Sequence, residues 1–289
     1  MYQARRTARS ESLTLRGMRC HLWRWGPAEQ PPIVLLHGFL DTGETFQFLA
    51  DCLPDDWQLV APDWRGFGRS EWNRGGYWFP DYLADLDALL EALSPGRPAR
   101  VVGHSMGGNV LALYAGTRPG RVERIALLEG FGLPRRRSRE APARYREWLD
   151  ELRGAPPRFA SYGSYESFAG FLAKRSPWLT PERALFIARA WGEERDGRVH
   201  LRSDPAHKLV YPVLYRRDEA RACWRNIAAP VLILLGGRSE YLARLGPDGD
   251  PAALRRAFRG ADVQTLAHCG HMMHHQDPEA VAAVLRRFF

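Results

Sequence analysis

Short apolar runs alternate with segments of helical period along most of this 289-residue chain. Apolar runs bounded by Gly, Pro and polar residues predict buried strands, and apolar residues at helical spacing predict helices. The predicted strands cover 32–36, 57–61, 99–103, 124–128, 230–235 and 262–266, and the predicted helices lie near 43–53, 80–93 and 106–117. This alternation indicates an α/β fold with a mostly parallel sheet that helices cover on both faces.

Both ends of the chain extend this pattern. Residues 12–15 and 20–25 flank a short turn and predict an antiparallel hairpin at the edge of the sheet, which brings the expected number of strands to eight. A last helix, from Asp277 or Pro278 to Phe289, has an apolar stripe through Val281 and Leu285. We expect that helix to dock on the sheet.

Residues 132–225 break the alternation and instead show helical periods rich in Arg, Trp and Tyr. No internal repeat accompanies the change. We expect a helical insertion over the carboxyl ends of the strands, where open α/β sheets bind ligands. The predicted core then comprises residues 1–131 and 226–289.

The segment Gly103-His104-Ser105-Met106-Gly107 has the form of a nucleophile elbow. It places a serine between two glycines, directly after a predicted strand and before a predicted helix. A serine on so tight a turn has strained backbone angles, and the glycines let the turn close. Ser105 is therefore the candidate nucleophile.

Two further segments fit this motif. The strand ending at Leu36 leads into His37-Gly38-Phe39, which would bring the N–H of Phe39 beside that of Met106 as a pair of oxyanion donors. Gly270-His271 follows the last predicted strand, so His271 is the candidate base. A base that follows the nucleophile in the chain agrees with the order serine, acid, histidine.

Four motifs in this order resemble those of the α/β-hydrolase superfamily. They are Leu36-His37-Gly38-Phe39, the segment APDWRGFGRS at 61–70, the elbow at 103–108 and Gly270-His271-Met272-Met273-His274. The resemblance implies that the insertion at 132–225 is a cap, or lid, that shapes the substrate pocket. Aromatic candidates for lining that pocket are Trp64, Trp72, Trp78, Phe39 and Phe131.

The acid that orients His271 has two main candidates. The resemblance implies a carboxylate, commonly an aspartate, just after the strand at 231–235, where this chain has Glu240. Glu129, at the end of the strand at 124–128, is the alternative because some relatives take the acid from that strand. Glu240 is our expected acid, and Asp248 and Asp250 are more remote candidates.

The expected chemistry is acyl transfer from an ester or a related acyl compound to Ser105, and then to water. A serine nucleophile argues against epoxide hydrolase or haloalkane dehalogenase activity, which in the resembling superfamily uses an aspartate. Carbon–carbon bond hydrolysis or haloperoxidase-like chemistry by the same residues is an alternative hypothesis. A non-catalytic ligand-binding or scaffold protein of the same fold is another. Water is the second nucleophile, so no cofactor is expected.

The histidines His268, His271, His274 and His275 crowd together and raise the question of a metal site. Their spacing on an expected loop is not one-faced helical geometry, and neither clustered carboxylates nor paired cysteines stand beside them. No metal is expected.

Composition adds less to this picture. The net charge is +8, but acidic residues are interleaved with the 41 basic ones and no nucleic-acid-binding motif is present, so no nucleic-acid partner is expected. The four cysteines lack C-x-x-C spacing, and no apolar run is long enough to span a membrane. These features favour a cytoplasmic protein acting on a small apolar substrate; they leave its oligomeric state open.

Overall fold

The computed structural model describes residues 2–289 and confirms the predicted fold class. Within that range an eight-stranded sheet has the order β1-β2-β4-β3-β5-β6-β9-β10. Its strands are β1 (Arg9–Leu15), β2 (Met18–Trp25), β3 (Ile33–Leu36), β4 (Leu59–Pro62), β5 (Ala99–His104), β6 (Val122–Leu128), β9 (Val231–Gly236) and β10 (Asp262–Leu266). Strands β1 and β2 form the expected antiparallel hairpin, β2 pairs antiparallel with β4, and the other neighbours pair in parallel.

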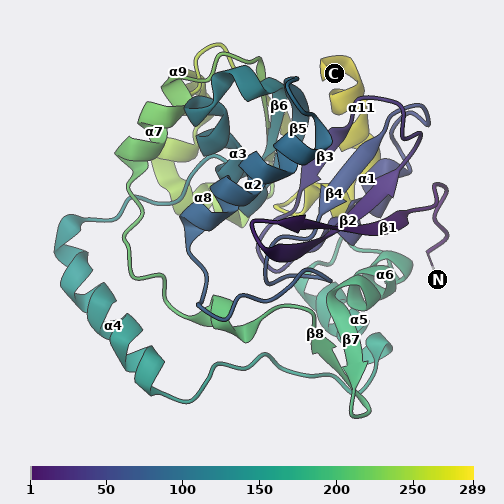
Figure 1. Cartoon of the computed structure of the whole chain (residues 1–289), viewed down its shortest axis with the longest axis vertical. Helices are drawn as coiled ribbons and strands as arrows, with labels where there is room; N and C mark the ends of the chain where they lie inside the picture. Colours follow the sequence, from purple (N-terminus) through teal and green to yellow (C-terminus); the bar gives the residue numbers. More distant parts are fainter. Residues whose placement is uncertain (1) are drawn as a thin grey trace.

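Helices cover both faces of this sheet (Figure 1). One face packs against α2 (Phe79–Leu93), α3 (Met106–Thr117), α7 (Arg217–Arg225) and α9 (Pro251–Ala257). The other face packs against α1 (Gln47–Ala50), α10 (Met273–Gln276) and α11 (Pro278–Phe288). Strands β3, β4 and β9 are buried along their whole length, which explains why they are continuous apolar runs.

The strand order reverses its direction of winding at β3. From β3 the chain passes to β4 on one side, and it then crosses back to β5 on the other side before it continues to β6 and β9. A crevice forms at such a switch point beyond the carboxyl ends of the strands. The loops after β3 and β5, which carry Phe39 and Ser105, meet there.

The chain between β6 and β9 is not all helical. It contains α4 (Ala141–Arg153), α5 (Tyr165–Arg175) and α6 (Pro181–Trp191), and also an antiparallel hairpin of β7 (Gly192–Arg195) and β8 (Arg198–Leu201) that the expectation of a helical insertion missed. Asp196-Gly197, both at positive φ, forms the turn, so the Asp-Gly dipeptide was the available signal. Helix α4 stands apart from the sheet at the left of Figure 1, whereas α7 packs on α3. The boundaries of a separate cap stay a prediction.

The predicted helix at 43–53 is shorter than expected. A 3₁₀ turn (Gly43–Phe46) precedes α1, which ends at Ala50. Pro54 follows shortly afterwards and disfavours helical backbone in the residue before it. None of the helices formed by residues 2–289 has both the length and the apolar character needed to cross a bilayer.

The contact between α3 and α7 depends on Gly116. A Cβ atom built there would lie 1.9 Å from the backbone oxygen of Cys223 in α7. We expect Gly116→Ala to lower the free energy of unfolding by about 2 kcal/mol or more, although alanine is the better helix former. Gly120→Ala is the matched control, because a Cβ at Gly120 meets no described atom within 4 Å. Equal stability of the two variants in urea unfolding would show that the helices are not in this contact.

Candidate active site

Ser105 lies at the turn between β5 and α3 with φ 49° and ψ −113°. This is the strained backbone of a nucleophile elbow, and it confirms that a sharp strand-to-helix turn holds the serine. The close approach of Gly107 to the neighbouring strand keeps the turn tight, since a Cβ at Gly107 would lie 2.4 Å from the backbone oxygen of Leu36. The strain is therefore supported by packing against β3.

His271 reaches Ser105 from the loop after β10. Its Nε2 lies 2.9 Å from Ser105 Oγ. The backbone oxygen of His271 accepts a hydrogen bond of 2.9 Å from Nε2 of His104, the buried residue that precedes the nucleophile. No sequence motif marks this hydrogen bond, which ties the position of His271 to the end of β5.

Glu129 is the carboxylate that contacts His271. Its Oε2 lies 2.7 Å from His271 Nδ1, and its side chain is fully buried at the end of β6. The backbone N–H of Gly236 donates to Oε1 at 2.7 Å, and the hydroxyl of Ser239 donates to Oε2 at 2.5 Å. Glu129 itself has a positive φ of 50°, which turns its side chain toward the base.

Glu240, the acid expected first, does not lie at the base. Its side chain is 91% exposed at the start of α8 (Glu240–Leu245), and its carboxylate lies 3.9 Å from Arg244. The turn after β9 points Ser239 inward instead, where it both caps α8 and donates to Glu129. Asp248 pairs with Arg217 at 3.0 Å, and Asp250 precedes α9. The alternative acid Glu129 is thus the one that the structure brings to His271.

The two candidate oxyanion donors lie close to Ser105. Met106 is the first residue of α3, where a helix leaves its backbone N–H without a partner inside the helix. The loop that carries Phe39 passes close to Ser105, because a Cβ at Gly38 would lie 3.1 Å from Ser105 Cβ. Both N–H groups are therefore near Ser105, and their role as donors stays a prediction.

His37 fixes the shape of that loop. Burial lowers the pKa of His37, so the ring is neutral. Its Nδ1–H donates to the backbone oxygen of Gly38 at 2.7 Å, and its Nε2 accepts from the backbone N–H of Trp64 at 2.9 Å. A neutral histidine with one donor and one acceptor nitrogen satisfies both contacts.

A cavity of about 800 Å³ opens beside Ser105. Its wall includes Met106, the residue after Ser105, and Phe39, from the loop that passes close to Ser105. The rest of its wall is mostly apolar and comes from α2, α3, α4, α7, the segment 206–216 and two loop residues, Trp78 and Leu133. The apolar residues of those elements include Leu83, Leu113, Trp148, Leu152, Leu209, Tyr211, Val213, Leu214, Tyr215 and Trp224. Of the aromatic residues expected in a pocket, Phe39 and Trp78 line it, whereas Trp64 and Phe131 are buried in the core.

His207 belongs to the cavity wall and was not identified from the sequence. Its ring stacks on Tyr77 at 3.6 Å and on Phe67 at 4.0 Å between ring centroids. Its Nδ1–H donates to the backbone oxygen of Asp204 at 3.0 Å, and its Nε2 lies 3.0 Å from the Tyr82 hydroxyl. Burial lowers the pKa of His207 to about 4. The side chain is thus a neutral, apolar-packed part of the wall.

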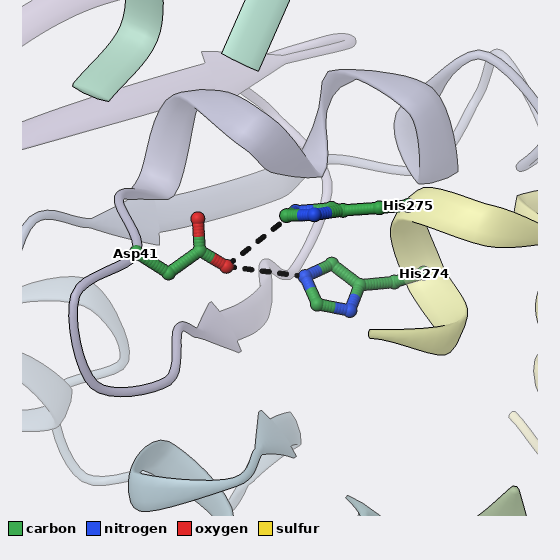
Figure 2. A group of neighbouring side chains, drawn as sticks. All are labelled: Asp41, His274 and His275. Atoms are coloured by element: carbon green, nitrogen blue, oxygen red, sulfur yellow. Dashed lines mark hydrogen bonds and ion pairs between the residues drawn. The ribbon is translucent and has the colours of Figure 1, made fainter. Parts of the chain in front are cut away.

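Among residues 2–289, two groups of side chains could hold a metal ion. The first is Asp41 with His274 and His275, all buried, in which both imidazoles face one carboxylate (Figure 2). The second is His268 with Cys269 and Asp277. Neither group includes Ser105, His271 or Glu129.

Comparison with known proteins agrees with this fold. The sequence model of the alpha/beta hydrolase fold family matches residues 31–278. The chain therefore belongs to the alpha/beta hydrolase family.

Several relatives align with most of the chain. A serine hydrolase-like protein of Danio rerio is 28% identical over 271 residues, which cover 91% of this chain and 83% of that protein. Lipase LipV of Mycobacterium tuberculosis is 28% identical over 289 residues, with coverages of 92% and 96%. The thioesterase domain from the curacin biosynthetic pathway superposes with a TM-score of 0.84 at 24% identity, over 97% of this chain and 99% of that domain, and shows the same fold.

The low pKa of His207 predicts acid sensitivity of the cavity wall. The unfolded chain binds a proton at this histidine near pH 6.5 and the folded chain only near 4, so folding stability falls as the pH drops through that window. In His207→Gln we expect the loss of unfolding free energy between about pH 7 and about pH 4.5 to be smaller by roughly 2 kcal/mol than in the unsubstituted protein. Urea unfolding at the two pH values measures it. Equal losses would show that His207 does not resist protonation.

Proposed function

We propose that this protein is a serine hydrolase that cleaves carboxylic esters or related acyl compounds, with Ser105, His271 and Glu129 as its catalytic triad. The hydrogen-bonded chain from Glu129 through His271 to Ser105, with distances of 2.7 and 2.9 Å, carries the proposal. Relatives that include a serine hydrolase-like protein and a lipase support the same class of reaction.

In the first half of the reaction, Ser105 Oγ attacks the carbonyl carbon of the substrate and His271 Nε2 takes the hydroxyl proton. The carbonyl oxygen becomes an oxyanion, which the backbone N–H groups of Phe39 and Met106 stabilise. His271 then gives its proton to the leaving alcohol or thiol as the carbonyl–heteroatom bond breaks. The product is an acyl group bound to Ser105.

In the second half, water attacks the acyl carbon while His271 Nε2 accepts a proton from it. The tetrahedral intermediate collapses, the bond to Ser105 Oγ breaks, and the proton on His271 returns to that oxygen. Glu129 holds Nδ1–H throughout, so Nε2 keeps its lone pair for the proton transfers. Ser239 and Gly236 keep the carboxylate in place, since each donates a hydrogen bond to one of its oxygens.

The cavity indicates the substrate class. Its wall near Ser105 is aromatic and aliphatic, so it favours an apolar acyl or alcohol group of considerable length. The segment 132–225 supplies the outer wall through α4 and residues 206–216, which supports its proposed role as a cap.

We propose a cytoplasmic location on a chemical ground. Cys20, Cys52, Cys223 and Cys269 are all free in the part of the chain that the structure describes. Reduced thiols are typical of the cytosol.

The two candidate acids give opposite predictions for catalysis. We expect Glu129→Gln to lower kcat for a p-nitrophenyl ester on the order of ten-thousandfold, because an amide cannot hold the imidazole in the required tautomer. Glu240→Gln is the matched control and should keep the kcat of the unsubstituted protein, since its carboxylate is in solvent. A large loss in Glu240→Gln with normal turnover in Glu129→Gln would overturn this triad.

A bulkier cavity wall should select against long acyl groups. Leu113 of α3 lines the cavity, so Leu113→Trp is expected to lower kcat/KM for a long-chain p-nitrophenyl ester about tenfold or more, with a smaller effect on the acetate. Leu149→Trp is the control, because Leu149 is exposed on α4 and does not line the cavity. An equal loss on both esters in Leu113→Trp would place the acyl group elsewhere.

A further inference from the structure

The geometry points to a buried site for a divalent transition metal, zinc being the reference case, formed by Asp41, His274 and His275. The carboxylate oxygen Oδ2 of Asp41 lies 3.3 Å from His274 Nε2 and 3.5 Å from His275 Nε2 (Figure 2). One candidate ligand atom from each residue lies within 4.8 Å of the others. This site goes beyond the triad, from which it is separate, and no step of the proposed reaction uses it.

Both contacts of Asp41 are long: the one with His274, at 3.3 Å, is a long hydrogen bond, and the one with His275, at 3.5 Å, is an ion-pair contact without a hydrogen bond. A hydrogen bond from an imidazole N–H to a carboxylate is commonly about 2.7–2.9 Å long. Within residues 2–289, the other histidine–carboxylate pairs are shorter than those at Asp41, at 2.7 Å for His271 with Glu129, 3.1 Å for His21 with Asp63 and 2.5 Å for His268 with Asp277. Among residues 2–289, His275 Nε2 has no hydrogen-bond partner although it is buried.

The same distances suit ligands around one ion. Zinc binds nitrogen and oxygen at about 2.0–2.1 Å, so two ligands of a tetrahedral ion stand about 3.3–3.4 Å apart. The separations of 3.3 and 3.5 Å at Asp41 are close to this distance between two ligand atoms. An ion between these atoms would also give the unpartnered His275 Nε2 a bond.

The surroundings of Asp41 resemble the outer shell of a metal site. Its other oxygen, Oδ1, accepts hydrogen bonds from the backbone N–H of Thr42 at 2.8 Å, the Thr45 hydroxyl at 2.7 Å and Trp191 Nε1 at 2.8 Å. These bonds fix the carboxylate and leave Oδ2 facing the histidines. Supporting hydrogen bonds of this kind orient ligands in known metal sites.

Charge also favours a cation. Asp41 is only 1% exposed. A buried carboxylate needs a compensating charge, which a divalent ion provides. Two imidazoles and a carboxylate suit zinc and similar ions better than magnesium or calcium.

The position of the site suggests its role. Asp41 follows Phe39 in the loop after β3, and His274 follows His271 in the segment after β10. His274 also packs against His104, with 4.3 Å between ring centroids. A metal ion here would brace the segment that carries the base against the loop that carries an oxyanion donor.

The second group serves as a control rather than a site. His268 Nε2 lies 2.5 Å from Asp277 Oδ2, a separation that two ligands of one tetrahedral ion would exceed. The His268 side chain is 60% exposed, so His268→Gln should fold normally and leave the proposed site intact.

The test is the zinc content of the full-length protein after incubation with zinc and extensive dialysis, measured by inductively coupled plasma mass spectrometry. We expect about one zinc per chain in the unsubstituted protein and in His268→Gln, and at least a tenfold lower content in His274→Gln and His275→Gln. Dipicolinate should lower Tm in the first two proteins, and added zinc should restore it. The cobalt-loaded protein should show the visible absorption of tetrahedral Co²⁺.

Three results would overturn the proposal. One is a zinc content far below one per chain in the unsubstituted protein, together with a Tm that dipicolinate does not change. A second is zinc that survives in a folded His275→Gln, and a third is zinc that is lost in His268→Gln. The first result would mean that the three residues form a buried ion pair with one protonated histidine. These results are zinc contents and melting temperatures and include no measurement of turnover by Ser105, so the metal proposal and the proposed function can fail separately.

Discussion

The buried carboxylate of Glu129 is the constraint on which the site depends. A fully buried carboxylate is stable only when its oxygens are hydrogen-bonded, and here the donors come from two different parts of the chain. Gly236 and Ser239 belong to the turn after β9, and His271 belongs to the loop after β10. The hydrogen bonds to this one carboxylate therefore fix both loops relative to β6, and they hold Nε2 of His271 beside Ser105 Oγ. The strained turn at Ser105 completes the arrangement because α3 packs through glycine against the end of β3.

The sheet could be predicted from the sequence because its parallel strands are buried on both faces. Such strands are continuous apolar runs, and their order along the chain follows from alternation with helices. The elbow and His271 were predictable for a similar reason, since each sits directly at the end of a predicted strand. The β7–β8 hairpin was missed although Asp196-Gly197 marked its turn, because its strands are short and partly exposed.

The acid could not be chosen from the sequence, because Glu129 and Glu240 both follow strands that end near the site. What separates them is the direction of one side chain. The turn after β9 directs Ser239 inward and leaves Glu240 in solvent, while a positive φ at Glu129 directs its carboxylate toward the base. The Asp41 cluster was hidden for a different reason. Its histidines are adjacent in the chain and follow β10, whereas their carboxylate partner follows β3, far away in the sequence. Only the fold brings the three residues together.

The central claim is that Ser105 is an activated nucleophile. It is tested most directly by treating the folded protein with a fluorophosphonate and locating any adduct by peptide mass spectrometry. The account predicts a single phosphonyl group on Ser105, because His271 removes the hydroxyl proton as the phosphorus is attacked, and it predicts no adduct in Ser105→Ala. An unlabelled but folded protein, or an adduct that persists in Ser105→Ala, would contradict it.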